Sequence, residues 1–283
     1  MMDTSSVPFK HVIVCADDFA AHSAASRGIA ALARAGRISA TSVMVLSPGW
    51  PQDVALLRDL PQAIDVGLHL DWTSEFAFAY GHGLTLGGAM VKAALGGFGR
   101  ASAGERTRAV IERQLDAFEA HWKEPPDFVD GHQHVQQFAG IREALVQALV
   151  KRYGASSVPM PYVRISRAPD GNADVKARVI AAMGASALER LAAEAGVPIA
   201  SALLGIYDFA GDQNRYRALM EGWLQQAAPA RSIIMCHPAQ DAPLHDAIGT
   251  ARQREFAYLS GAQFPAALER ASVGIVRGNS FDR

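Results

Sequence analysis

The 283-residue chain has few cysteines, no excess of charge of one sign and no long apolar run. Its two cysteines, Cys15 and Cys236, lie in apolar stretches, which indicates core residues in a reducing compartment rather than a disulfide framework. The formal net charge is −1 at pH 7, so composition predicts neither a nucleic acid nor an anionic membrane partner. No apolar stretch approaches the ~20 residues that cross a bilayer, and no signal-peptide pattern is seen at the N-terminus. These absences predict a cytoplasmic protein without a membrane span.

Short apolar runs alternate with amphipathic stretches along the chain. Hydrophobic residues make up 49% and charged residues 19%, as in ordinary globular proteins. The runs predict strands at 11–16, 38–46, 63–70, 127–134, 161–166, 202–209, 232–238 and 273–276. Helices are predicted at 23–35, 51–59, 103–122, 140–152, 173–195 with an interruption at Gly184, 213–227 and 250–271.

This alternation of strands and helices predicts an α/β fold with mostly parallel strands. About eight strands favour an irregular TIM-like (β/α) barrel, with a doubly wound open sheet as the alternative. No internal repeat and no linker-like boundary is present, so residues 1–283 are expected to form a single domain. The Gly- and Ala-rich interval 75–104 is long for a βα loop, and we expect it to lie over the active-site mouth, with a helix at 87–95.

Unusual polar residues follow the predicted strands at the point where each strand ends. They are Asp17, Asp18, His69, Asp71, Asp130, His132, His134, Arg164 and His237. Because the carboxyl ends of parallel strands meet at one edge, we expect these side chains to lie close together. The period-two spacing of Asp130, His132 and His134 predicts that an extended strand presents them on one face. Asp17 and Asp18 are neighbours, so both reach one centre only if the strand ends at Ala16 or Asp17.

One carboxylate with two imidazoles is a common ligand set for a divalent metal ion. A metal would compensate the charge of Asp18, and Asp17 beside it would be free to act as a general base. His237 on another strand is then a candidate general acid. The candidate substrate-binding residues are His134, Asp71 and Trp72. Each residue also has an ordinary structural interpretation, with the aspartates as helix caps, His69 as a core histidine and Arg164 in an ion pair.

The motifs "ADDF" (16–19), "GLHL" (67–70) and "DGHQH" (130–134), an Arg on the next strand and "HP" (237–238) occur in one order. In this combination the chain resembles the YdjC/ChbG carbohydrate deacetylase family, which includes HpnK-type members. The resemblance implies an irregular (β/α) barrel, often dimeric, with a divalent metal at the carboxyl ends of the strands. It also implies removal of acetyl groups from N-acetylated sugars such as chitooligosaccharide derivatives.

The resemblance assigns roles to individual residues. It implies that Asp18, His69 and His132 bind the metal, that Asp17 is the general base and that His237 is the general acid. Arg164 matches the Arg on the fifth strand, which would orient Asp17 or the substrate. Arg252 and Glu255 match an Arg-x-x-Glu stretch and are expected to support the structure or the site from outside.

The chain departs from the family pattern at several positions. Ala20 and Ala239 stand where Gly is usual, Gln136 stands where many members have a third His, and "DWTSEF" (71–76) replaces the usual segment after "GLHL". None of these changes removes a predicted metal ligand. The last two concern the substrate pocket, so the sequence does not predict chitobiose-type specificity.

The sequence therefore predicts a metal-dependent hydrolase that removes an N-acetyl group from an acetamido sugar. In this hypothesis water on the metal attacks the acetyl carbonyl, Asp17 takes its proton and His237 protonates the leaving amine. The alternatives are a non-catalytic sugar- or metal-binding barrel and a metal-dependent amidohydrolase acting on a non-sugar amide. One divalent ion is expected, Mg²⁺ or Zn²⁺ first and Mn²⁺, Co²⁺ or Ni²⁺ as alternatives. The expected partner is a small acetylated sugar or oligosaccharide, with a homodimer implied by the resemblance.

Overall fold

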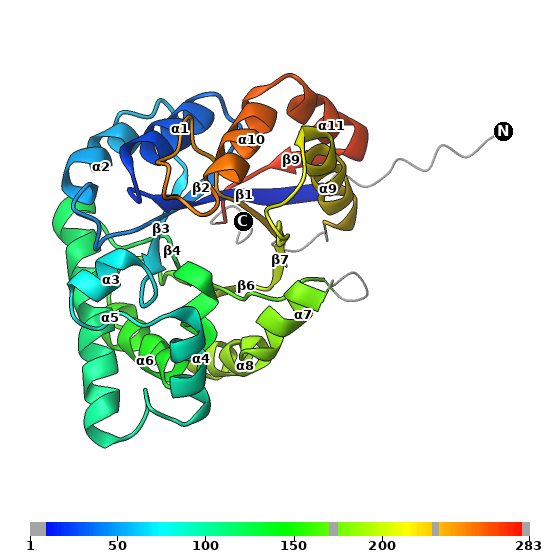
Figure 1. Ribbon diagram of the computed structural model, residues 1–283. Helices are drawn as coiled ribbons and strands as arrows, with labels where there is room; N and C mark the ends of the chain where they lie inside the picture. The colour runs from blue at the N-terminus through cyan, green and yellow to red at the C-terminus, as the bar shows by residue number, and fades with distance from the viewer. Residues whose placement is uncertain (1–9, 170–174, 228–231, 279–283) are drawn as a thin grey trace.

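Parallel strands form a curved sheet at the centre of the computed structural model, which describes residues 10–169, 175–227 and 232–278 (Figure 1). The hydrogen-bonded order is β6-β5-β4-β3-β2-β1-β8-β7, and β9 also pairs with β1. The strands are β1 (Lys10–Phe19), β2 (Ala40–Val43), β3 (Asp65–Leu70), β4 (Phe128–Gly131), β5 (Tyr162–Arg164), β6 (Ile199–Ala200), β7 (Ala202–Leu204), β8 (Ser232–Cys236) and β9 (Val273–Ile275).

The two ends of this strand order meet through a single residue. Only Ser201 separates β6 from β7, yet β6 pairs with β5 and β7 pairs with β8. The sheet must therefore curve round on itself, and the strands form a nearly closed barrel. The predicted irregular TIM-like barrel is confirmed, and the open doubly wound sheet is not formed.

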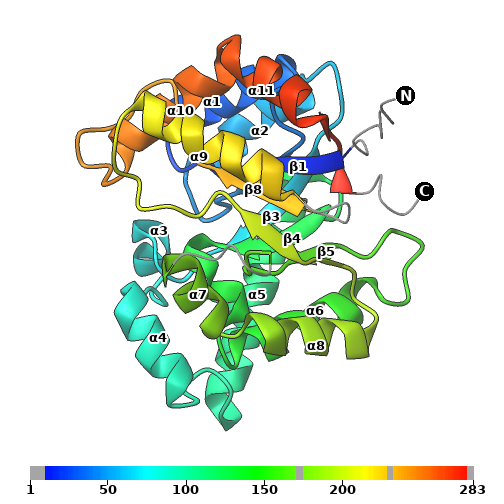
Figure 2. The ribbon, with the colours of Figure 1, turned by 90° about the vertical axis from the view of Figure 1, so that its right-hand side faces the viewer.

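Helices lie around the outside of the barrel, with α1, α10 and α11 on one side and α6 and α8 on the other (Figure 1, Figure 2). The helices are α1 (Ser23–Arg34), α2 (Trp50–Arg58), α3 (Glu75–Ala79), α4 (Leu86–Ala94), α5 (Ala101–Trp122), α6 (Ile141–Tyr153), α7 (Val175–Ala182), α8 (Ala185–Ala195), α9 (Gln213–Gln226), α10 (Gly249–Ser260) and α11 (Gln263–Ala271), with the 3₁₀ helix η1 (His132–Gln137). None of the helices in the described ranges is both long enough and apolar enough to cross a membrane.

Most predicted helices are present, and the breaks at Gly184 and Gly261 compare differently with the prediction. The expected interruption at Gly184 separates α7 from α8. Gly184 has a φ of 134°, a backbone angle that residues with a side chain rarely adopt. The single helix predicted over 250–271 is wrong, because the chain leaves the helical conformation at Gly261, between α10 and α11. The helix expected at 87–95 is present as α4.

The central strands are buried because helices cover their outer face and the barrel interior covers the other. Val12, Ile13 and Val14 of β1 are all fully buried, which explains the continuous apolar run at this place in the sequence. Toward the carboxyl ends of the strands the buried residues become polar. Asp17, Asp130 and Arg164 are almost inaccessible to solvent, so their charges have to be balanced inside the protein.

Strand β1 does not end at Ala16 or Asp17, as the adjacency of the two aspartates predicted, but continues to Phe19. Ala16 pairs with Thr41 and Phe19 with Val43, so β1 has one more residue than β2 in this interval. Within this bulge Asp18 has a left-handed backbone with a φ of 68°. A bulge re-aims side chains at a strand end, and here it brings two neighbouring carboxylates to one side of the barrel.

Ala20, just after the bulge, is expected to be a strained position. It has a φ of 69° and is buried, and the left-handed region costs a residue with a Cβ about 1–2 kcal/mol. Because glycine also loses more entropy on folding, Ala20→Gly should raise the free energy of unfolding by a net ~0.5–1 kcal/mol. Urea denaturation followed by circular dichroism would measure this change. Ala21→Gly, at a neighbour without positive φ, is the control and should lower stability; a loss of stability in Ala20→Gly would contradict the strain argument.

Candidate metal centre and its cavity

A cavity of about 670 Å³ opens at the carboxyl ends of the strands. The predicted site residues that line it are Asp17, Asp18, His69, His132, His134, Arg164 and His237. These residues come from β1, β3, η1, β5 and the segment after β8. The barrel therefore brings together side chains that are spread over 221 positions of the sequence. Asp71 and Trp72 are not among the lining residues.

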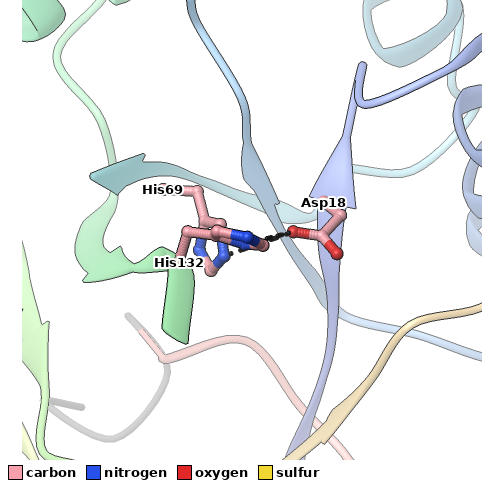
Figure 3. A group of neighbouring side chains, drawn as sticks. All are labelled: Asp18, His69 and His132. Atoms are coloured by element: carbon pink, nitrogen blue, oxygen red, sulfur yellow. Dashed lines mark hydrogen bonds and ion pairs between the residues drawn. The ribbon is translucent and has the colours of Figure 1, made fainter. Parts of the chain in front are cut away.

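Asp18, His69 and His132 converge on one point of the cavity (Figure 3). Oδ1 of Asp18 lies 3.4 Å from Nε2 of His69 and 3.2 Å from Nδ1 of His132. The three ligand atoms lie within 4.8 Å of one another. Asp18 and His69 are buried, whereas the His132 side chain keeps 24% of its surface exposed. The group is therefore closed on the barrel side and open toward the cavity.

A second carboxylate stands behind His69. Nδ1 of His69 lies 2.6 Å from Oδ1 of Asp130, and Oδ2 of Asp130 forms an ion pair of 2.9 Å with Arg164. A carboxylate on the far nitrogen of an imidazole is the usual support of a metal-binding histidine, because it fixes the tautomer and turns the other nitrogen to the metal. Burial alone would lower the pKa of His69, but Asp130 and Asp18 raise it to about 10. This place in the site thus favours a positive charge, and the donor set fits a divalent cation.

The second oxygen of Asp18 is held from outside the cavity. Nη2 of Arg252 donates to Oδ2 of Asp18 at 2.7 Å, and Nε of Arg252 donates to Asp246 at 2.8 Å. Burial opposes ionisation of Asp18, but Arg252 and the bond from His132 outweigh it, so its pKa lies well below the usual value. Asp18 is therefore a fixed anion whose Oδ1 faces the two imidazoles.

Asp17 is held just as firmly by a different arginine. Nη1 and Nη2 of Arg164 donate to its two oxygens at 2.7 and 2.8 Å. Burial opposes ionisation of Asp17 as well, but the Arg164 guanidinium outweighs burial and keeps the pKa of Asp17 below its ordinary range. Such a bidentate pair fixes both the charge and the plane of the carboxylate.

His237 follows β8, the strand that pairs with β1 and places Cys236 beside Ala16. Its backbone N–H donates to Oε2 of Glu255 at 2.6 Å, and its ring stands edge-on to Phe209 with the centroids 5.3 Å apart. Nδ1 of the ring has no hydrogen-bond partner among the described residues. Burial lowers the pKa of His237 to about 4, so the imidazole is neutral at pH 7.

The expectation that Asp130, His132 and His134 share a face of an extended strand is wrong. Strand β4 ends at Gly131, and Gln133 and His134 adopt left-handed backbone conformations inside η1. His132 and His134 still line the cavity because the chain turns there. Nδ1 of His134 lies 2.9 Å from the Ser166 hydroxyl, and burial lowers the pKa of His134 to about 3.

Gln136, which stands where many members of the resembled family have a histidine, connects η1 to the strand beside it. Its side-chain amide donates to the carbonyl of Arg164 at 3.1 Å and to the Ser166 hydroxyl at 3.0 Å. Ser166 is the partner of His134. The departure at Gln136 is therefore accommodated by a hydrogen-bond chain that orients His134.

Asp71 and Trp72 shape the loop after β3. The Asp71 carboxylate accepts hydrogen bonds from the backbone N–H groups of Thr73 and Ser74 and from the Ser74 hydroxyl. Trp72 is 2% exposed and packs edge-on against His82 and Phe98. The structure gives neither residue a contact with the cavity, so their predicted part in substrate binding receives no support from geometry.

One wall of the cavity is apolar, and part of it comes from the interval 75–104 that was expected at the mouth of the site. It is formed by Leu86 and Met90 of α4, by Val179 and Ile180 of α7 and by Met183 just after α7. A second hollow of about 380 Å³ between α4 and α7 shares Met90, Val179 and Met183 with the cavity. The apolar wall therefore continues from the cavity into this second hollow, called the groove between α4 and α7 below. Asp246 and Phe209 also line the cavity, and no motif singled them out.

Comparisons with known proteins place the chain in a family and relate its fold to solved structures. The model of the YdjC-like protein family matches residues 11–270. A candidate cellobiose-phosphate cleavage protein from Enterococcus faecalis V583 is similar in structure, with a TM-score of 0.69 and 17% identity over 96% of this chain and 99% of that chain. A family 4 carbohydrate esterase from Streptomyces lividans, solved with acetate, has a TM-score of 0.42 and 12% identity over 93% of this chain and 90% of that chain. No curated protein matches the chain in sequence.

Proposed function

The chain belongs to the YdjC-like family, and we propose that it is a single-domain, metal-dependent hydrolase that removes an N-acetyl group from an acetamido sugar. One observation carries the proposal. A carboxylate and two imidazoles converge at 3.2–3.4 Å, and a further carboxylate and a neutral histidine line the same cavity. This set supplies what amide hydrolysis requires, namely a site for a Lewis acid, a proton acceptor and a proton donor.

Asp18 Oδ1, His69 Nε2 and His132 Nδ1 are the atoms that would hold the ion. When bound, a divalent ion would polarise the acetyl carbonyl and lower the pKa of a water molecule. Two imidazoles with one carboxylate suit Zn²⁺, and also Mn²⁺, Co²⁺ or Ni²⁺, better than Mg²⁺, which prefers oxygen ligands. We therefore place Zn²⁺ first, ahead of the Mg²⁺ considered with it from the sequence.

Asp17 and His237 would move the protons. Asp17 is ionised and locked in plane by Arg164, so it can accept a proton from the attacking water without reorienting. His237 is neutral in the resting site, because burial lowers its pKa to about 4. Negative charge developing on the substrate favours the imidazolium, so His237 would take up a proton from solvent as the tetrahedral intermediate forms. It would pass this proton to the amine nitrogen as the C–N bond breaks, and Asp17 would release the proton of the attacking water to solvent.

The test of the proposal is acetate release by the purified protein from a panel of N-acetylated sugars. The panel should include N-acetylglucosamine, its β-linked oligomers and its alkyl glycosides, each with a chelator and with added Zn²⁺, Mn²⁺, Co²⁺, Ni²⁺ or Mg²⁺. Metal-dependent acetate release from one of them is the expected result. Binding of metal and sugar with no release across the panel would favour the non-catalytic barrel instead. Acetate release confined to simple amides without a sugar would favour the other amidohydrolase alternative.

The apolar wall predicts a preference among these substrates. A buried methylene contributes about 0.8 kcal/mol, and the groove between α4 and α7 offers apolar surface next to the site. A butyl glycoside of N-acetylglucosamine has three more methylenes than the methyl glycoside, and burial of about two of them should lower its KM about tenfold. Met183→Gln should remove most of the difference, and equal KM values in the wild type would show that the wall does not contact the substrate.

Asp130→Asn tests the support behind His69. The amide can no longer accept a strong charge-assisted bond from Nδ1 of His69, which lies 2.6 Å from the carboxylate. Loss of such a carboxylate typically weakens metal binding about 10–100-fold, so isothermal titration with Zn²⁺ should show a decrease of this size. Asp208→Asn, which changes an exposed carboxylate paired with Arg215, is the matched control. An unchanged Zn²⁺ affinity in Asp130→Asn would argue against His69 as a ligand.

A further inference from the structure

We propose that helix α10 positions both halves of the site, with Arg252 fixing the carboxylate of Asp18 and Glu255 fixing the backbone of His237. Arg252 and Glu255 are thus positioning residues that act through other side chains and do not touch the reacting atoms. The inference rests on the proposed function for the roles of Asp18 and His237. The hydrogen bonds themselves are independent of that function.

Arg252 joins Asp18 to the loop that precedes α10. It donates to Oδ2 of Asp18 at 2.7 Å and to Oδ2 of Asp246 at 2.8 Å. Its side chain is 7% exposed and that of Asp18 is 2% exposed, so water screens this ion pair little. A monodentate bond to Oδ2 leaves Oδ1 toward His69 and His132. Arg252 therefore decides which oxygen of Asp18 is offered to a metal.

Glu255 lies one helical turn after Arg252 and is also completely buried. Its two oxygens accept hydrogen bonds of 2.6 Å from the His237 backbone N–H and of 2.6 Å from the Tyr207 hydroxyl. The Tyr207 ring packs against Phe209 with the centroids 4.9 Å apart, and Phe209 stands against the His237 ring. Both the backbone and the ring of His237 are thus connected to one carboxylate.

The position of Glu255 is difficult to explain by packing alone. Burial raises its pKa to about 7, which reflects the cost of a carboxylate that pairs with no cation among the described residues. An apolar residue would fill the same space without this cost. The ring of His237 lacks the carboxylate that usually orients a catalytic histidine, since Nδ1 has no partner in the described part of the chain. In this structure His237 is oriented through its backbone N–H, which donates to Glu255.

The first experiment measures Zn²⁺ binding by isothermal titration, which requires no activity. Arg252→Met should weaken Zn²⁺ binding about 10–100-fold, as expected for a residue that orients a ligand. The Zn²⁺ affinity of Arg252→Lys should lie between that of Arg252→Met and that of the wild type. Glu255→Ala should bind Zn²⁺ within about threefold of the wild type. Gln253→Ala, on the exposed face of the same helix, is the matched control. Equal losses in the Arg252 and Glu255 variants would indicate general damage to α10 and overturn the division of roles.

The second experiment concerns His237. Glu255→Ala should lower kcat about 10–100-fold with little change in KM. Glu255→Gln should retain a larger fraction of the wild-type kcat, because its amide oxygen can still accept a hydrogen bond from the His237 N–H and its NH₂ group can donate one to Tyr207. In nuclear magnetic resonance spectra the His237 backbone amide proton should lie far downfield in the wild type and shift upfield in Glu255→Ala. If Glu255→Ala does not fold, Tyr207→Phe, which removes one of the two hydrogen bonds, replaces it and should give a smaller decrease.

The outcomes separate this inference from the proposed function. If the wild type releases acetate from no substrate, the proposed function fails, while the Zn²⁺ affinities and the His237 amide shift still decide the positioning roles. If acetate is released but Glu255→Gln is as impaired as Glu255→Ala, or the amide proton does not move, the role of Glu255 is wrong and the proposed function stands.

Discussion

Chelation of the divalent ion should reduce acetate release by at least about 10³-fold, and Asp18→Asn should have the same effect without chelator. A bound ion contributes several kcal/mol to stabilisation of charge in the transition state, and each ~1.4 kcal/mol is tenfold in rate. Asp18 is the one carboxylate in the convergent set, at 3.4 and 3.2 Å from the two imidazoles, so its amide analogue should bind the ion poorly. Stopped assays of acetate after dialysis, with and without added Zn²⁺, measure both effects.

The ion should also change stability, which gives a readout independent of turnover. A ligand at about 1,000 times its Kd stabilises the folded state by ~4 kcal/mol, so Zn²⁺ should raise the Tm of the wild type clearly and that of Asp18→Asn little. Activity in the wild type should return on adding the ion back, whereas Asp18→Asn should stay inactive. Full activity of the chelated wild type would exclude a metal-dependent mechanism at this site.

Asp17→Asn should lower kcat by about 10²–10⁴-fold, the usual contribution of a positioned general base. Asn cannot accept the proton of the attacking water, although it has nearly the same shape. The low pKa of Asp17 limits the driving force for proton transfer, and the bidentate contact with Arg164 compensates by fixing the geometry. Initial rates on the best substrate, with Zn²⁺ saturating, measure the effect.

The matched measurement for Asp17→Asn is Zn²⁺ affinity, which should stay within a few-fold of the wild type because Asp17 is not in the convergent set. Arg164 keeps its ion pair with Asp130 in this variant, so the protein should still fold, as a thermal melt would show. A variant that retains full kcat would show that another group takes the proton. His237, a neutral imidazole in the same cavity, would be the first candidate.

Much of the site was predictable because its residues are polar where the chain is otherwise buried. The sequence pattern identified Asp17, Asp18, His69, His132, Arg164 and His237, and the structure brings these residues into one cavity. Their individual roles stay predictions. The barrel was predictable for a related reason, since alternating buried strands and amphipathic helices leave few ways to cover both faces of a parallel sheet.

Other features depend on local backbone conformations that the pattern does not show. The sequence suggested that β1 ends before Asp18. Instead, a bulge and the left-handed backbone of Asp18 bring both carboxylates to the cavity while the strand continues. The sequence also suggested an extended strand through His134, but the chain turns after Gly131. Asp71 follows a predicted strand just as Asp17 does, yet its carboxylate accepts hydrogen bonds from the backbone of its own loop. The position of a residue after a strand predicts at which edge of the barrel it lies, but not in which direction its side chain points.

The sequence by itself determined the fold class, the edge at which the polar residues lie and a set of side chains that could hold a divalent ion. Each of these follows from hydrophobic periodicity and from the cost of buried charge, which act locally along the chain. Only the tertiary structure decided which oxygen of Asp18 faces the imidazoles, which carboxylate supports His69 and how α4 and α7 form an apolar wall. These depend on contacts between residues more than 60 positions apart, for example Asp18 with Arg252 at a separation of 234. The two adjacent aspartates thus have different partners because of a single extra residue in β1.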